Sequence, residues 1–234
     1  MKYTTLLMDA DDTIFDFPKC EYAALKNALE DCGYPFSDET AESFSRINAA
    51  LWKQFEIGQI TRSELRVKRF KEMIAQCFCG CTEGRADCET AADQYVKRLA
   101  QQARFIDGAE QALEKLSERY EIYIITNGLK TVQEGRFALA RLDRYIKKIY
   151  ISDAMGVQKP SKEYFDAVLA DLPGKDKDRI LVVGDSLTSD MQGGRNAGFD
   201  TCIYDPKGKI TMPHDLCDYR IDSLEELLYR EEFI

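Results

Sequence analysis

The chain has 234 residues, a formal net charge of −9 and 44% hydrophobic residues. This length allows one large domain or a core that carries an insert, and the apolar fraction excludes disordered and low-complexity classes. The acidic balance disfavours a nucleic-acid polymer or a membrane surface as partner. No apolar run approaches the ~20 residues that span a bilayer, and the acidic residue Asp9 closely follows the first apolar run, so we expect a cytoplasmic protein without a signal peptide.

The first predicted element is a buried strand from Tyr3 to Met8. From residue 17 to 105 the apolar residues follow helical spacing, and no strand pattern interrupts them. Four helices are predicted, and a capping-box pattern at Thr61–Glu64 opens the third. Their apolar stripes are Tyr22, Leu25, Leu29 and Cys32; Phe44, Ile47, Leu51 and Phe55; Val67, Phe70, Ile74 and Cys77; and Ala92, Tyr95 and Leu99.

From residue 106 onward, helix and strand patterns alternate. A helix with Ala109, Leu113 and Leu116 on one face precedes a buried strand at 122–125, and Thr131–Glu134 is predicted to cap the next helix. Further buried strands are predicted at 148–151, 180–183 and 201–204. This alternation predicts an α/β fold with a doubly wound, Rossmann-like parallel sheet. We expect a core domain of residues 1–16 and 106–234, into which an all-helical domain of residues 17–105 is inserted.

Polar residues follow four predicted strands at their C-terminal ends. Ligands of open α/β sheets bind outside these ends, so we expect the polar residues to converge. Carboxylates held close together need a cation, and an all-oxygen ligand set selects Mg²⁺, which in turn suits a phosphoryl group. The polar residues, in chain order, are Asp9 and Asp11, Thr126 and Asn127, Lys159, and Asp185 and Asp190.

These motifs resemble those of the haloacid dehalogenase-like (HAD) superfamily of aspartate-nucleophile phosphotransferases. The pattern hhhDxDxT lies at Leu6–Thr13, the strand-end threonine is Thr126, the lysine is Lys159, and GDxxxxD lies at Gly184–Asp190. The resemblance implies that the helical insert is a cap domain. The segments 51–58 and 159–165 are similar to the pyrimidine 5′-nucleotidase branch, although Lys162 stands where many relatives have a second proline.

The resemblance implies a Mg²⁺-dependent phosphomonoester hydrolase with an aspartyl-phosphate intermediate. In this mechanism Asp9 is the nucleophile, and Asp11 is the general acid and base. The presence of Asp11 also argues against dehalogenation, because halide leaves without a proton. The implied Mg²⁺ ligands are Asp9, the backbone carbonyl of Asp11, Asp185 and Asp190, and the implied phosphate-binding residues are Thr126, Asn127 and Lys159.

The expected substrates are small phosphometabolites, with pyrimidine nucleoside 5′-monophosphates first. A sugar-phosphate mutase and a phosphoglycolate or sugar phosphatase remain open alternatives. A non-catalytic phospho-receiver module is a remote alternative, because receivers are shorter and keep their acidic pair adjacent. Candidate specificity residues are Phe15, Phe17 and the turn Gln59–Arg62. The protein is expected to be a monomer or a homodimer.

Two further patterns have weaker functional interpretations. Residues 184–187 spell the GDSL signature of serine esterases, but the only histidine, His214, has Thr211 where its aspartate partner should stand. We therefore interpret Ser186 as a loop residue. A cysteine group has CxCxC spacing and no neighbouring histidine, so reduced thiols are favoured over a zinc site; it comprises Cys77, Cys79, Cys81 and Cys88.

Overall fold

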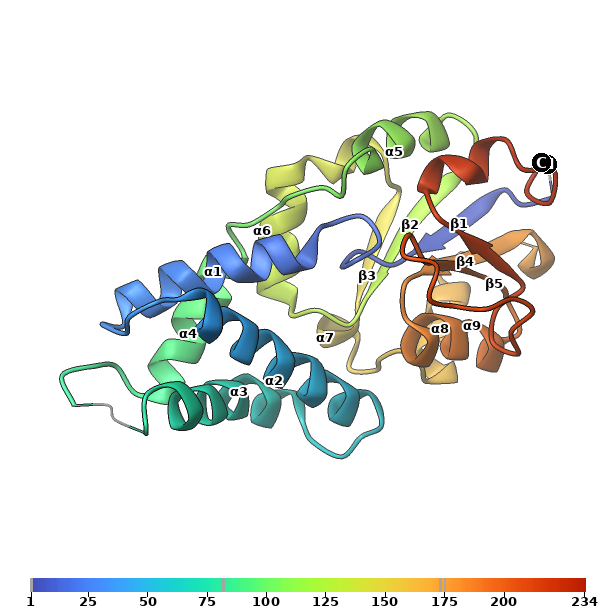
Figure 1. The fold of residues 1–234 in the computed structure, drawn as a ribbon. Coiled ribbons are helices and arrows are strands. Elements are labelled where there is room, and N and C mark those ends of the chain that lie inside the picture. The colour runs from blue at the N-terminus through green and yellow to red at the C-terminus, as the bar shows by residue number, and fades with distance from the viewer. Residues whose placement is uncertain (1, 81–82, 173, 175) are drawn as a thin grey trace. The chain divides into compact units, whose positions relative to one another are not determined.

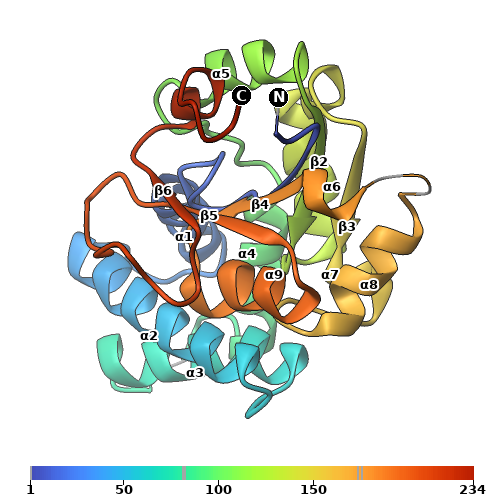
Figure 2. The ribbon, with the colours of Figure 1, turned by 90° about the vertical axis from the view of Figure 1, so that its right-hand side faces the viewer.

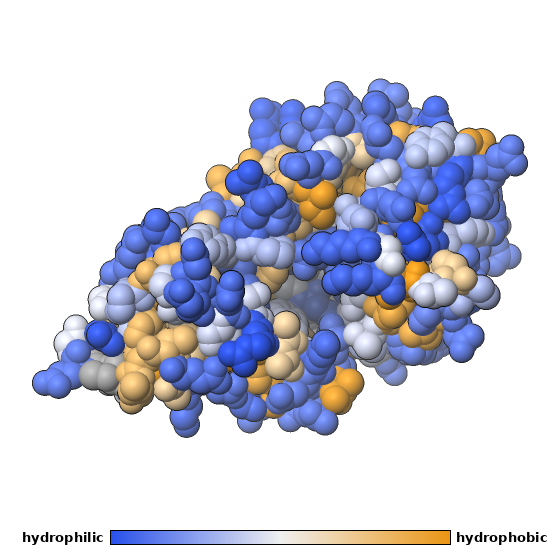
Figure 3. Space-filling view, in the orientation of Figure 1, coloured by the Kyte–Doolittle hydropathy of each residue, from blue (hydrophilic) through white to orange (hydrophobic). Residues whose placement is uncertain are grey.

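The computed structural model describes residues 2–80, 83–172, 174 and 176–234. The chain divides into two compact units. The first comprises Met1–Asp16, Arg104–Gln133 and Ala140–Ile234, and the second comprises Phe17–Ala103 and Glu134–Leu139. Within the described residues, every helix is too short or too polar to cross a membrane. Hydrophilic side chains cover most of the face seen in Figure 3.

The first unit contains a six-stranded parallel sheet with strand order β3-β2-β1-β4-β5-β6. This confirms the predicted doubly wound sheet. Strand β1 lies between β2 and β4, and Leu6, Leu7 and Met8 are fully buried. The strands are β1 (Thr5–Met8), β2 (Glu121–Thr126), β3 (Lys148–Ile151), β4 (Ile180–Gly184), β5 (Asp200–Tyr204) and β6 (Tyr219–Ile221). The edge strand β6 was not predicted, because three residues with a central arginine give no apolar run.

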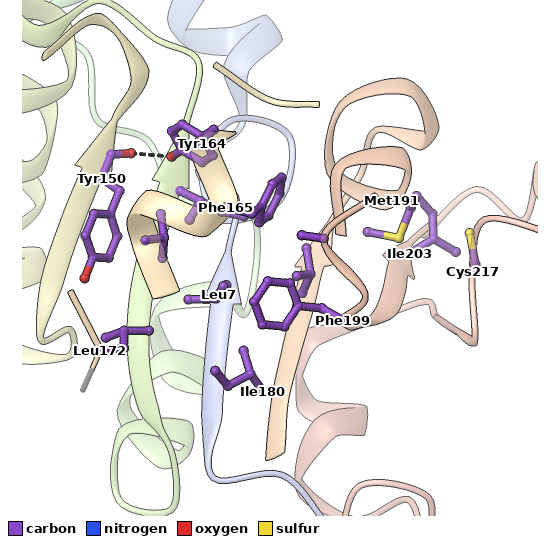
Figure 4. Packing of buried hydrophobic residues seen from close by; sticks show 14 residues of the cluster. Leu7, Tyr150, Tyr164, Phe165, Leu172, Ile180, Met191, Phe199, Ile203 and Cys217 are labelled. Carbon is purple, nitrogen blue, oxygen red and sulfur yellow. Dashed lines mark hydrogen bonds between the residues drawn. The ribbon is translucent and has the colours of Figure 1, made fainter. Parts of the chain in front are cut away.

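Helices cover both faces of this sheet (Figures 1 and 2). Helix α5 (Ala109–Ser117) lies on one face, and α8 (Lys162–Ala170) and α9 (Gln192–Ala197) lie on the other. Tyr164 and Phe165 of α8 pack onto the sheet around Leu7, and the Tyr164 hydroxyl donates to the Tyr150 carbonyl oxygen at 2.8 Å (Figure 4). Short helical segments complete the connections: α7 (Ser152–Met155), η1 (Leu142–Arg144), η2 (Lys177–Arg179), the π-helical turn η3 (Leu187–Met191) and η4 (Leu224–Leu228).

The second unit consists mainly of four helices: α1 (Phe17–Asp31), α2 (Asp38–Glu56), α3 (Arg62–Cys77) and α4 (Cys88–Leu99). The predicted capping box is present, because Thr61 accepts from the Glu64 backbone N–H and the Glu64 carboxylate accepts from that of Thr61. The stripes predicted for α2 and α4 are buried.

The stripes predicted for α1 and α3 are partly wrong. Tyr22 is 42% exposed, whereas the neighbouring Glu21 is buried; in α3, Val67 and Cys77 are only partly buried, whereas Arg69 is buried. Hydrogen bonds explain the difference. Asn48 of α2 donates to Glu21 Oε1 at 2.7 Å and accepts from Arg69 Nη1 at 3.2 Å. Polar groups that satisfy one another can be buried, and apolar periodicity does not reveal them.

Helix α6 (Lys130–Ala140) begins one residue before the predicted cap, so Thr131 lies inside the helix. The Lys130 N–H instead donates to Asp153 Oδ2 at 3.0 Å, a contact between residues distant in sequence. The helix is shared between the units, since Lys130–Gln133 belongs to the first and Glu134–Leu139 to the second. In the second unit, the fully buried Arg136 donates from Nε to the Gln102 carbonyl oxygen at 2.9 Å.

Candidate active site

The predicted site residues meet at the carboxyl end of the sheet in the first unit. Strands β2, β1 and β4 are adjacent, so Thr126 at the end of β2, Asp9 after β1 and Asp185 after β4 share one edge. The Asp9 N–H extends the strand pairing by donating to the Val183 carbonyl oxygen at 2.8 Å. Lys159 reaches the same place from the loop before α8.

Three carboxylates form an acidic cluster, with one oxygen from each of Asp9, Asp185 and Asp190 within 4.8 Å of the others. Asp9 and Asp190 are buried, whereas Asp185 is exposed. Asp190 lies on the π-helical turn and accepts from the Ser186 N–H at 3.2 Å. Gly184 makes room for it, because a Cβ at this position would lie 2.3 Å from Asp190 Oδ2.

Lys159 forms ion pairs with two of these carboxylates. Its Nζ lies 2.6 Å from Asp9 Oδ1 and 2.6 Å from Asp190 Oδ1, and it donates to the Ile125 carbonyl oxygen at 2.9 Å. Burial lowers the pKa of Lys159, but the charges of Asp190 and Asp9 raise it overall. The ammonium group is therefore charged and fixed in position.

The carboxyl groups still repel one another. Burial raises the pKa of Asp9 to about 8, although the Lys159 charge opposes this shift. Desolvation and the like charges of Asp9 and Asp190 raise the pKa of Asp185 well above its usual value, even though part of that side chain reaches solvent. A site with raised carboxyl pKa values is one in which a bound cation is favoured.

The donor set of this cluster fits Mg²⁺. All three groups are carboxylates, which suit a hard divalent ion. One oxygen of each lies within 4.8 Å of the others, so the three residues are placed to hold a single ion. The side chain of Asp11 is not in the cluster; one of its oxygens instead faces Gln133.

Thr126 and Asn127 make different contacts at the end of β2. The buried Thr126 accepts through Oγ1 from the Gly128 N–H at 3.1 Å and from Gln133 Nε2 at 2.7 Å. Asn127, which we predicted to bind phosphate, uses its side chain to accept from the Lys159 N–H at 3.0 Å and to donate to the Lys159 carbonyl oxygen at 2.9 Å. The Asn127 side chain thus fixes the backbone that carries Lys159.

The loop after β1 carries Asp11 and buries Phe15. The N–H groups of Ile14 and Phe15 both donate to the Ala10 carbonyl oxygen, at 2.9 and 2.8 Å. Asp12 adopts φ 62°, a left-handed conformation that Asp tolerates better than most residues. Phe15 is fully buried, with its ring 5.3 Å from that of Phe105. Phe15 thus has a packing contact here, and a role for it in reading the leaving group stays a prediction.

The other specificity candidates lie in the second unit. Phe17 is half-buried at the start of α1, and the Arg136 guanidinium lies 5.9 Å from its ring. Gln59 is exposed, and the Arg62 guanidinium lies 4.9 Å from the ring of Phe55. Both are contacts of a guanidinium group with an aromatic ring. A role for these residues in substrate recognition stays a prediction.

Ser186 and His214 have structural contacts of their own. Ser186 caps the π-helical turn, where its Oγ accepts from the Ser189 N–H at 3.1 Å, and His214 Nδ1 accepts from the Leu216 N–H at 3.1 Å. The Ser186 contact agrees with the interpretation of Ser186 as a loop residue. Among the predicted thiols, Cys81 lies outside the described residues, and the others are free: Cys77, Cys79 and Cys88.

Sequence reasoning missed Gln133. This side chain is fully buried and donates to both Asp11 and Thr126. Its position in the chain was interpreted only as part of a helix cap. A glutamine one turn into a helix carries no local signal of a site, because the contact depends on where the fold places Gln133 relative to the loop after β1 and the end of β2.

Comparison with known proteins identifies the family. A family model described as haloacid dehalogenase-like hydrolase matches residues 6–204. The chain is 36% identical over 228 residues to HAD-hydrolase YfnB of Bacillus subtilis, which covers 97% of this chain and 95% of that protein. A crystal structure of YfnB bound to magnesium has a TM-score of 0.89 and covers 97% of both chains.

Two other relatives carry names of phosphatases. Pyrimidine 5′-nucleotidase PynA of Streptococcus pneumoniae is 34% identical over 229 residues, which are 97% of this chain and 94% of that protein. Glyceraldehyde 3-phosphate phosphatase of Pyrococcus furiosus is 33% identical over 230 residues, which are 95% of this chain and 90% of that protein. The family match over most of the chain confirms the resemblance drawn from the motifs, and the chain belongs to the haloacid dehalogenase-like hydrolases.

Proposed function

We propose that this protein is a Mg²⁺-dependent phosphomonoester hydrolase that acts through an aspartyl-phosphate on Asp9. The observation that carries the proposal is the acidic cluster of Asp9, Asp185 and Asp190, in which Asp9 and Asp190 pair with the Lys159 ammonium group. Carboxylates at this spacing suit a divalent cation and, through it, a phosphoryl group. One similar protein is named a pyrimidine 5′-nucleotidase and another a glyceraldehyde 3-phosphate phosphatase, and both names support phosphomonoester hydrolysis.

In the first half-reaction, a carboxylate oxygen of Asp9 forms a bond to phosphorus as the bond to the leaving oxygen breaks. Asp11 gives its proton to the leaving oxygen, so that an alcohol departs. In the second half-reaction, water attacks phosphorus, the bond to Asp9 breaks, and Asp11 takes the proton from the water. Atoms and charge balance over the cycle, and the products are an alcohol and inorganic phosphate.

The remaining residues stabilise charge on the phosphoryl oxygens. Lys159, Thr126 and the backbone N–H after it are the proposed donors to these oxygens. Asp9, the Asp11 carbonyl oxygen, Asp185 and Asp190 would hold Mg²⁺. When bound, the ion screens the negative charges of nucleophile and substrate from each other.

For the substrate, we propose pyrimidine nucleoside 5′-monophosphates such as UMP, dUMP and dTMP. The similarity to PynA over nearly the whole chain supports this choice, because the likeness includes the helical unit. A small sugar phosphate is the second candidate, and the 33% identity to a glyceraldehyde 3-phosphate phosphatase supports it.

The test is phosphate release by the purified protein from a panel of small phosphomonoesters, with Mg²⁺ and with a chelator. The panel contains pyrimidine and purine nucleoside monophosphates, phosphoglycolate, glyceraldehyde 3-phosphate and hexose phosphates. We expect Mg²⁺-dependent release that is fastest with a pyrimidine nucleotide. Faster turnover of a sugar phosphate would favour the second candidate, and interconversion of sugar phosphates without net release would contradict the hydrolase.

The nucleophile is tested by Asp9→Asn, which keeps the shape of the side chain but cannot attack phosphorus. We expect no turnover and no acid-stable labelling with radioactive phosphate. The matched control is Asp12→Asn, the same substitution in the same loop at a left-handed position that Asn also adopts. This control should retain most of the activity. Near-normal turnover of Asp9→Asn would refute the mechanism.

A further inference from the structure

The Gln133 side chain joins two residues of the proposed reaction. Its Nε2 donates to Asp11 Oδ2 at 2.9 Å and to Thr126 Oγ1 at 2.7 Å, and the residue is fully buried. An amide nitrogen carries two hydrogens, so both bonds form at the same time. The reverse orientation would place the amide oxygen against the Asp11 carboxylate, and this repulsion fixes the donor group toward Asp11.

Gly128 provides the space in which the Gln133 amide lies. A Cβ at Gly128 would be 2.5 Å from Gln133 Nε2 and 2.7 Å from its Cδ. The φ angle of Gly128 is outside the left-handed region, so any residue could adopt this backbone. Glycine is therefore needed here for room rather than for conformation, and Gly128 and Gln133 form a complementary pair.

The contacts of Thr126 determine the direction of its hydroxyl hydrogen. A hydroxyl group has two acceptor positions and one donor hydrogen. Both acceptor positions of Thr126 Oγ1 are taken, by the Gly128 N–H at 3.1 Å and by Gln133. The hydrogen of Thr126 is therefore left to donate to a third group, which is what a phosphoryl oxygen requires.

The same amide holds the Asp11 carboxyl group. Oδ2 of Asp11 accepts from Gln133 at 2.9 Å, so the carboxyl group is attached to a buried side chain of helix α6. In general acid catalysis the donor must be held within hydrogen-bond reach of the leaving oxygen, so the position of this carboxyl group affects the rate of proton transfer.

We propose that Gln133 is a positioning residue for proton transfer: it holds the Asp11 carboxyl group in place and directs the Thr126 hydroxyl hydrogen toward a third group. The inference rests on the proposed function, because it assigns Asp11 the role of general acid. Gln133 is thus assigned an effect on the rate through Asp11 and Thr126, not through a contact with the substrate.

The test variant is Gln133→Met, which keeps a similar length and removes both donors. We expect single-turnover formation of the phosphoenzyme from UMP to fall roughly 10- to 100-fold, part of the ~10²–10⁴-fold effect of general acid catalysis. With p-nitrophenyl phosphate, whose leaving group needs little protonation, the loss should be at least tenfold smaller. In an Asp11→Asn background, the same substitution should show no such difference between substrates, because no proton donor remains to be positioned.

Two further variants separate positioning from a general structural effect. Gly128→Ala should displace the Gln133 amide and reproduce the difference between substrates, and it provides the same test if Gln133→Met does not fold. Val132→Ala truncates a neighbouring buried side chain of α6 and should lower thermal stability without any difference between the substrates.

Equal losses on both substrates in Gln133→Met and Gly128→Ala would overturn the proposal. A difference that persists undiminished in the Asp11→Asn background would overturn it as well. Failure of the proposed function would give different results. The wild-type protein would then form no phosphoenzyme, or Asp9→Asn would remain active. The two failures are therefore distinguishable in the same set of proteins.

Discussion

Replacement of Lys159 by methionine is expected to destabilise the first unit strongly when no divalent ion is present. The side chain is 2% exposed and contacts Asp9 and Asp190, both buried, at 2.6 Å each. Removal of one partner of a buried ion pair costs about 3–5 kcal/mol, because a charge is left uncompensated. Native proteins have only about 5–15 kcal/mol of stability, so the free energy of unfolding should fall by a large fraction.

The pH dependence of this loss has a definite sign. Burial already raises the pKa of Asp9 to about 8 in the presence of Lys159, and loss of the lysine charge raises it further. A carboxyl group with a folded pKa above its unfolded value of about 3.9 stabilises the fold only while protonated. That contribution is fully present below the unfolded pKa and is lost as the pH rises through the folded pKa. The variant should therefore lose stability between pH 5 and pH 8, by up to about 1.4 kcal/mol per pH unit for each such group.

Urea unfolding followed by circular dichroism measures this effect. Tryptophan fluorescence would not report on the sheet, because the only tryptophan, Trp52, lies in the helical unit. We expect the loss to be smaller with saturating Mg²⁺ than with a chelator, since the ion supplies positive charge to the same carboxylates. The control is Lys162→Met, which removes an exposed pair with Asp166 and should cost about 0.5 kcal/mol or less. A loss below about 1 kcal/mol for Lys159→Met at pH 8 in chelator, or stability that rises with pH, would refute the reasoning.

Three further expectations follow from particular contacts. Mg²⁺ at ten times its dissociation constant should stabilise the wild-type protein by about 1.4 kcal/mol, and thus raise its melting temperature by roughly 3–6 °C, whereas Asp185→Asn should show a much smaller shift in the same calorimetric scan. Asn48→Leu should lower the free energy of unfolding by about 2–4 kcal/mol, because Glu21 and Arg69 lose their shared partner; a loss no larger than that of a surface variant would contradict the buried hydrogen-bond chain. Gly184→Ala should weaken Mg²⁺ binding measured by titration calorimetry, since the added methyl displaces Asp190, and unchanged affinity would be inconsistent with that clash.

The fold was predictable because its two signals are local. Buried parallel strands appear as short apolar runs, and amphipathic helices appear as stripes, so β1 to β5 and the helices of the second unit were placed from the sequence. The errors fall where polar groups pair with distant residues. Glu21 is buried by Asn48, and α6 begins with a contact to Asp153, so neither the buried face of α1 nor the start of α6 follows from its own segment.

The candidate site also contains residues that the sequence predicts and residues that it does not. Asp9, Thr126 and Asp185 could be predicted to meet because parallel strands bring their carboxyl ends to one edge, whatever the side chains are. The ligands of a reaction centre can thus be identified from strand ends alone. The groups that orient those ligands cannot, because they approach from helices and loops whose packing is not encoded in a local pattern.

Gln133 and Gly128 illustrate why residues at strand ends can be predicted from sequence, whereas the residues that orient them cannot. Gly128 looks like a turn glycine in the sequence, yet its backbone conformation is an ordinary one, and the glycine is needed because the Gln133 amide occupies the place of a Cβ. Neither residue is informative alone, since a glycine after Asn and a glutamine in a helix are both common. Together they confine a side chain that donates to both Asp11 and Thr126. The geometry of a site of this type therefore depends on pairs of residues that restrict each other's positions. The polar motifs at the strand ends do not reveal such pairs.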